Sequence, residues 1–99
     1  MNPQRTTLFL MANLASEVFQ VFSFKKRGEY SNARQAVERA GRILAQLKSY
    51  PEMESRKAEL STLEEVVNDS ARAEPVFDIS EEQMEAYFFP FTTRLLAQR

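Results

Sequence analysis

An apolar stretch near the start of the chain places the strongest constraint on the fold. Between Leu8 and Phe22 the polar side chains fall three and four residues apart and form one narrow stripe, which consists of Asn13, Ser16, Glu17 and Gln20. In an α-helix with roughly 100° between residues, apolar side chains would cover about 200° of the remaining circumference. The pattern predicts a helix over about Pro3 to Arg27 that is buried except along one wet edge.

The same stretch has the length and apolar character of a membrane span, since residues 6–24 contain a single charged residue. That residue, Glu17, lies near the middle, where an acidic side chain costs roughly 2–3 kcal/mol on insertion scales. The stretch also lacks the basic start and small-residue cleavage site of a signal peptide. We therefore expect a soluble, cytoplasmic protein that makes no contact with a membrane.

The composition excludes several kinds of chemistry. The 99 residues include no Cys, so disulfides, thiolate zinc sites and cysteine nucleophiles are excluded. They include no His either, which removes the commonest general base at neutral pH and the commonest metal ligand. We expect a non-enzymatic protein with no catalytic residues, no metal site and no cofactor.

A second helix is expected from about Glu29 to Lys48. Its apolar residues are spaced 3-4-3-4-3, which is typical of antiparallel or coiled-coil-like packing; they are Tyr30, Ala33, Val37, Ala40, Leu44 and Leu47. The short connection through Gly28 makes the first two helices antiparallel neighbours. Gly41, beside this seam, costs helix stability and is interpreted as allowing a close helix crossing.

Two more helices complete the prediction. The third, about Pro51 to Ala73, is the most polar and should cover the core from outside. The fourth opens with a capping box, Ser80 and Gln83, and contains Pro90, which should kink or break it. The fold class is therefore all-α, a four-helix up-down bundle that forms a single domain over residues 1–99.

Aromatic residues are numerous for so small a domain, with eight Phe and three Tyr. Four short helices hardly cover an apolar arc of about 200° on the first helix, and a small domain buries only about 60–65% of its unfolded surface. We therefore predict a homodimer in which the first helix and part of the fourth helix form the interface between the two copies. The predicted interface residues are Leu8, Met11, Phe19, Phe22, Phe88 and Phe91.

A cluster of three cations, Lys25, Lys26 and Arg27, follows the first helix and is a candidate contact for an anion. The same cluster is equally typical of a helix C-terminus, where cations interact favourably with the helix dipole. The net charge of −1 does not favour nucleic acid as a partner. Charge is unevenly distributed, however. Residues 1–50 contain eight Lys and Arg but three Asp and Glu, whereas residues 51–99 contain five Lys and Arg but eleven Asp and Glu.

The segment from Leu8 to Val18, with its Ala-Asn-Leu and Ser-Glu-Val, resembles the start of a group of small uncharacterised helical proteins from prokaryotes. The likeness covers about residues 7–47 and includes the turn Lys25-Lys26-Arg27-Gly28-Glu29. In architecture the chain is similar to the four-helix bundles of HEPN-type and nucleotidyltransferase-associated proteins. The resemblance implies a dimer, with a role in RNA cleavage or in substrate binding beside a nucleotidyltransferase. The ribonuclease motif of that group requires a His, so a ribonuclease role is not carried over.

Two hypotheses for function follow. The first is a non-enzymatic interaction module that acts as a homodimer, with a further protein partner possible. The second is a substrate-binding or RNA-binding subunit of a nucleotidyltransferase-like system, which would use the cluster of three cations and the arginines of the second helix.

Overall fold

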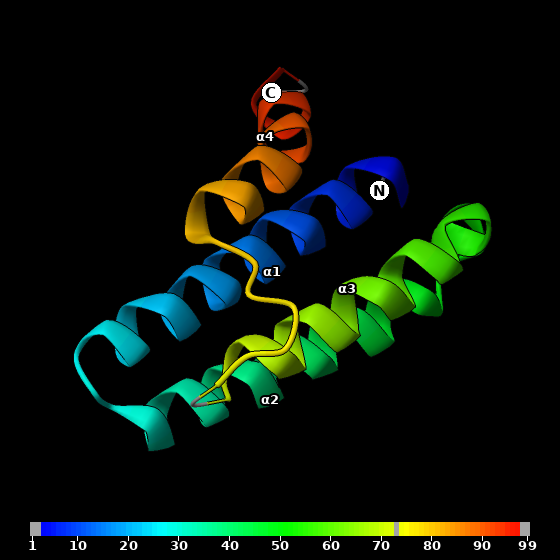
Figure 1. Ribbon diagram of the computed structural model, residues 1–99. Coiled ribbons are helices and arrows are strands. Elements are labelled where there is room, and N and C mark those ends of the chain that lie inside the picture. Colours follow the sequence, from blue (N-terminus) through cyan, green and yellow to red (C-terminus); the bar gives the residue numbers. More distant parts are fainter. Residues whose placement is uncertain (1–2, 73, 98–99) are drawn as a thin grey trace.

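The computed structural model describes residues 3–72 and 74–97, with side chains over 6–72, 74–94 and at 97. The predicted all-α class is confirmed for these residues, which form helices and no strand. The four α-helices are joined by short connections, and a short 3₁₀ helix precedes the third (Figure 1). Their bounds are α1 Pro3–Lys26, α2 Tyr30–Lys48, η1 Pro51–Arg56, α3 Lys57–Ser70 and α4 Glu81–Ala97.

The turn between α1 and α2 is built on Gly28. Its φ of 74° lies in the left-handed region, which suits glycine because glycine has no Cβ. Its N–H donates to the carbonyl of Lys25 at 2.9 Å, and the N–H of Glu29 donates to the carbonyl of Phe24 at 2.8 Å. This pair of bonds is a Schellman motif, which ends α1 and returns the chain as α2.

Helix α1 lies in the middle of the fold, with α2 on one side and α4 on the other (Figure 1). Helix α3 packs mainly on α2, and contacts α1 less. The main core gathers one face of every helix, with its fully covered large side chains at Met11, Leu14, Val18, Leu44, Leu47, Leu60, Val67 and Phe88. Where α1 meets the start of α2, a second, smaller cluster forms around Val21, Ala33 and Ala36. The fold therefore places α1, the most apolar helix, between two others.

The wet edge predicted for α1 is present. Asn13, Ser16 and Gln20 are exposed, whereas Glu17 is half-buried against α2. There the carboxylate of Glu17 accepts two hydrogen bonds from Nε of Arg39, both at 3.0 Å. The window Thr6–Lys26 passes the length and composition test for a membrane span, and 44% of that window is buried in the fold. Core helices of soluble proteins pass the same test, so it does not decide where the protein resides.

The close packing of α1 and α2 depends on alanine and not on Gly41. Ala33, Ala36 and Ala40 are completely buried. A Cβ built on Gly41 would meet no atom within 4 Å. The interpretation of Gly41 as a close-crossing residue is therefore wrong, because the glycine lies beside the contact and not in it.

Replacing Gly41 by Ala is expected to raise the free energy of unfolding by about 1 kcal/mol, because the helix gains propensity and no neighbour has to move. Urea unfolding of the variant and the parent would measure the difference. Gly28→Ala is the matched control and should be destabilising, because Ala is strained at a φ of 74°. A loss of stability in Gly41→Ala would contradict the open space described around that residue.

The third element is shorter and less regular than predicted. Pro51 to Arg56 form the 3₁₀ helix η1, and the α-helix begins only at Lys57 and ends at Ser70, not Ala73. Tyr50 is extended, with φ −83° and ψ 130°, as expected for a residue that precedes proline. The tight turn that follows buries Met53 against the core.

The start of α4 confirms the predicted capping box. The N–H of Gln83 donates to Oγ of Ser80 at 3.1 Å, and the N–H of Ser80 donates to Oε1 of Gln83 at 2.7 Å. Of the kink or break predicted at Pro90, the break is wrong, because α4 continues through this residue. Proline has no N–H, so the carbonyl of Ala86, one turn before Pro90, loses its usual hydrogen-bond donor. Both residues are exposed, so water can bind that carbonyl instead.

Candidate functional site

The six residues predicted to form a dimer interface lie mostly in the core of the chain itself. Leu8, Met11, Phe88 and Phe91 are buried. Phe19 and Phe22 are half-buried against the same core. They are covered because α4 lies across α1, and the rings of Phe19 and Phe88 meet edge to face with 6.2 Å between centroids. The dimer itself stays a prediction, but its interface has to be assigned to other side chains.

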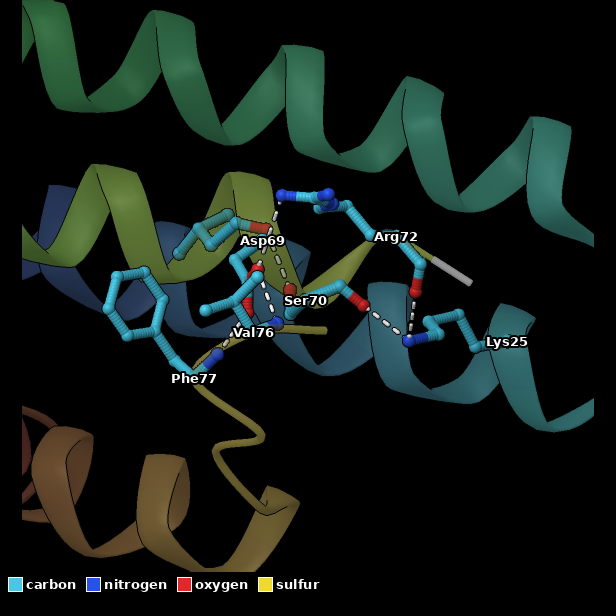
Figure 2. A network of polar contacts seen from close by, with 7 residues as sticks. Lys25, Asp69, Ser70, Arg72, Val76 and Phe77 are labelled. Carbon is cyan, nitrogen blue, oxygen red and sulfur yellow. Dashed lines mark hydrogen bonds and ion pairs between the residues drawn. The ribbon is translucent and has the colours of Figure 1, made fainter. Parts of the chain in front are cut away.

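The three cations proposed as an anion contact are all engaged within the chain. Nζ of Lys25 donates to the carbonyls of Ser70 at 2.6 Å and Arg72 at 2.9 Å, at the C-terminal end of α3 (Figure 2). Lys26 forms an ion pair with Glu81 at 2.6 Å. Arg27 pairs with Glu29, and its guanidinium lies 5.1 Å from the centroid of the Phe24 ring. These residues join helix ends, and an anion would have to compete with their present partners.

Asp69, near the end of α3, holds the linker that leads to α4. Its carboxylate is buried and accepts hydrogen bonds from the backbone N–H groups of Val76 at 2.8 Å and Phe77 at 2.9 Å (Figure 2). Arg72 lies 3.9 Å away, and Lys25 also contributes positive charge. Burial opposes ionisation of this carboxyl, but the two N–H donors and the cations outweigh it, so the pKa of Asp69 is lowered.

This anchoring fixes two large apolar side chains in solvent. Val76 is 71% exposed and Phe77 is 51% exposed, although their backbones are hydrogen-bonded to a buried group. We call these two residues the apolar tip. It was not identified in the sequence analysis above. The available signal was a Val-Phe pair inside a short polar connection.

An apolar groove lies next to the tip, between α3 and α4. Its volume is about 390 Å³, and it is lined by Glu59, Thr62, Leu63, Val66, Ile79, Gln83, Met84 and Tyr87. Leu63 and Met84 are buried and belong to the core. The groove exists because α4 packs on α1 and α3 packs on α2, while α3 and α4 are not a closely packed pair in the described part of the chain. We call this hollow the α3–α4 groove.

A hydrogen bond closes one end of the α3–α4 groove. The hydroxyl of Tyr87 on α4 donates to Oε2 of Glu59 on α3. Burial, together with this bond to a carboxylate, raises the pKa of Tyr87, so the hydroxyl stays protonated and remains a donor. The pair therefore bridges α3 and α4, with the Tyr87 hydroxyl as the donor.

No family model, curated protein or solved structure matches the chain. Within residues 3–72 and 74–97, no three acidic side chains come together in a way that could hold a metal ion. The apolar tip and the α3–α4 groove both present apolar surface to solvent.

Acid is expected to weaken the anchoring of the linker. The pKa of Asp69 is lower in the folded than in the unfolded chain, so the ionised carboxylate stabilises the fold. This stabilisation is complete above about pH 4, the ordinary pKa of Asp. It is lost as the pH falls through the pKa of the folded state. Asp69→Asn, which can accept fewer hydrogen bonds, should lower the thermal midpoint at pH 7 by about 5 °C. The deficit relative to the parent should shrink toward pH 3.

Thermal unfolding followed by circular dichroism at both pH values would measure this effect. Glu65→Gln is the matched control, since Glu65 lies one turn earlier on α3 with its side chain exposed. Its midpoint should stay near that of the parent at pH 7. A deficit in Asp69→Asn that is equal at pH 7 and pH 3 would contradict the ionised state assigned to Asp69.

Proposed function

We propose that the protein is a non-enzymatic helical interaction module that acts as a homodimer. The observation that carries this proposal is the apolar tip, whose backbone is hydrogen-bonded to Asp69 while its side chains are exposed, together with the α3–α4 groove. Single exposed hydrophobic residues are normal on a soluble protein, but a contiguous apolar surface usually marks an interface.

The arrangement of the helices is consistent with this proposal. Lys26 pairs with Glu81, so α4 starts where α1 ends and runs back along it. This ion pair supports an up-down arrangement, in which consecutive helices alternate in direction and the side between α3 and α4 is open. We propose that a partner on this side completes the bundle and removes the apolar groove from water.

Sedimentation and light scattering on the purified protein would test the proposed dimer. We expect a species of twice the 11.5 kDa chain mass at micromolar concentrations. Dissociation should follow mass action on dilution. A protein that stays monomeric across that range would contradict the proposal.

A role in binding RNA or a substrate beside a nucleotidyltransferase has less support, because Lys25, Lys26 and Arg27 are occupied by acceptors of the chain. Another basic feature is a shallow hollow between α2 and α3, which is lined by Arg34 and Arg72 but also by Glu38. A titration with single-stranded RNA at low salt, where phosphate contacts are strongest, would test this role. Absence of binding there would exclude it.

A further inference from the structure

Helix α4 is attached to the rest of the fold mainly through α1. The buried side chains in its described part are Met84, Phe88 and Phe91. The other three α-helices have contacts that do not involve α4, because α2 packs on both α1 and α3. The smaller cluster, where α1 meets the start of α2, contains no residue from the described part of α4. Helices α1, α2 and α3 therefore keep much of their packing when α4 is lifted away.

The linker between α3 and α4 is longer than the gap that it bridges. Two neighbouring residues of α1 reach its two ends. Nζ of Lys25 donates to the carbonyl of Ser70, where α3 ends, and Nζ of Lys26 pairs with Glu81, where α4 begins, each at 2.6 Å. Residues 71–80 would span roughly 33 Å if fully extended, which is farther apart than two adjacent lysines can reach. The linker therefore contains slack.

This slack is taken up beside α3. The apolar tip shares a hollow with Glu65 and Asn68, which precede Asp69 on α3, so the linker doubles back before it turns toward α4 (Figure 1). The buried carboxylate of Asp69 holds it there, through the N–H groups of Val76 at 2.8 Å and Phe77 at 2.9 Å. Both bonds end on one carboxylate, so release of this single group frees the linker.

The polar contacts between α4 and its neighbours are modest. Lys26 and Glu81 form their ion pair at the surface, where such pairs contribute little to stability. The hydroxyl of Tyr87 donates one hydrogen bond to Glu59 of α3. Within α4, Pro90 removes a backbone hydrogen bond. An element that is held by few buried side chains and by exposed polar contacts is typical of a unit that opens locally.

We infer that α4 is a hinged cover on α1 and that Asp69 is its latch. When the latch releases, α4 and the linker detach as one unit while α1, α2 and α3 stay folded. Opening uncovers one side of α1, which carries Ala15, Phe19, Phe22 and Lys26. These residues are spaced by four, three and four positions and so share a face, and Phe19 and Lys26 contact α4 directly. The opening takes place within one chain, so it is independent of the proposed homodimer.

Labelling of single thiols under native conditions tests the cover. The chain contains no Cys, so an introduced thiol reports on one position. Ala15 is 3% exposed on the side of α1 that α4 covers, and Ala36 is completely buried in the smaller cluster. With iodoacetamide, the thiol of Ala15→Cys should react at least about tenfold faster than that of Ala36→Cys. The first is reached by opening of α4, whereas the second is reached only by global unfolding.

Two further substitutions, made in each of these variants, separate opening from unfolding. Asp69→Asn should speed labelling at both positions by about tenfold, because the latch is absent from the open state and from the unfolded state alike. Gly41→Ala stabilises α2, which is folded in both the closed and the open state. It should slow labelling at position 36 by about fivefold and leave position 15 within about twofold of its parent. Glu65→Gln, the exposed neighbour on α3, should change neither rate.

The results that would overturn the inference are distinct. If position 15 reacts no faster than position 36, or slows with it in Gly41→Ala, α4 opens only when the whole chain unfolds. If Asp69→Asn leaves labelling at position 15 unchanged, Asp69 is not the latch. A labelling rate that varies with protein concentration would show that α4 moves between copies and not within one chain. A monomeric protein would overturn the proposed homodimer and leave these expectations as they are.

Hydrogen exchange gives a second measurement that needs no introduced Cys. In the parent protein, the amides of Met84 and Phe88 should exchange as a group. Their exchange should be faster, and less sensitive to urea, than that of Ala36 and Ala40 in α2, because opening of α4 exposes less surface than global unfolding. Equal protection of the two groups would overturn the hinged cover, whatever the cysteine variants show.

Discussion

Replacing Phe88 by Ala is expected to lower the free energy of unfolding by about 3–5 kcal/mol. The ring is 2% exposed and meets Phe19 and Tyr87 edge to face, with centroids 6.2 and 5.0 Å apart. It joins α4 to α1, so a cavity there would weaken the contact that covers the most apolar helix. Small domains are stable by only about 5–15 kcal/mol, so this change removes a large share of the total.

The adjacent Phe89 provides a matched control for Phe88. Phe89→Ala makes the same chemical change one position later in α4, where the ring is 68% exposed. Its effect on the free energy of unfolding should stay within about 0.5 kcal/mol. Chemical unfolding of both variants at the same protein concentration would measure the difference. Equal losses in the two variants would contradict the placement of α4 on α1.

Ala40→Asp should be comparably damaging, with an expected loss of about 4 kcal/mol or more. Ala40 is completely buried in the main core. A carboxylate there would lose its hydration, and its extra atoms would have to displace packed neighbours. The variant should be largely unfolded at 25 °C, with circular dichroism and expression yield both reduced.

Ala45→Asp controls for the lower helix propensity of Asp. Ala45 lies on the exposed face of the same helix, so the substitution should cost about 0.5 kcal/mol, the difference in propensity alone. If Ala45→Asp unfolds the protein as thoroughly as Ala40→Asp, the loss of stability comes from the low helix propensity of Asp and not from burial of its carboxylate. A folded Ala40→Asp protein would contradict the close packing described between α1 and α2.

Local sequence signals predicted the helices well. Ser80 and Gln83 form the bonds that their spacing indicates, and Gly28 ends α1 because its backbone conformation excludes most other residues. Such signals act over three to five residues and do not depend on the rest of the fold. The roles expected of Gly41 and Pro90 differed: Gly41 allows no close crossing because it meets no neighbour, and Pro90 does not break α4 because it faces water.

Long-range arrangement could not be predicted in the same way. A wide apolar arc on α1 indicates that the helix must be covered, but not whether the cover comes from its own chain. That is why Met11 and Phe88 were assigned to an interface and are found in the core. The candidate site was missed for a related reason, since Asp69 and Phe77 are joined by a contact across eight residues that no local pattern encodes.

The order in which the helices cover α1 also matters while the chain is being made. Helix α2 can pack on α1 as soon as the hairpin through Gly28 emerges from the ribosome, because these contacts are local in sequence. The other side of α1 stays uncovered until Phe88 and Phe91 have been synthesised, more than sixty residues after Phe22. During that interval one side of α1, a helix with the length and apolar composition of a membrane span, has no cover from its own chain.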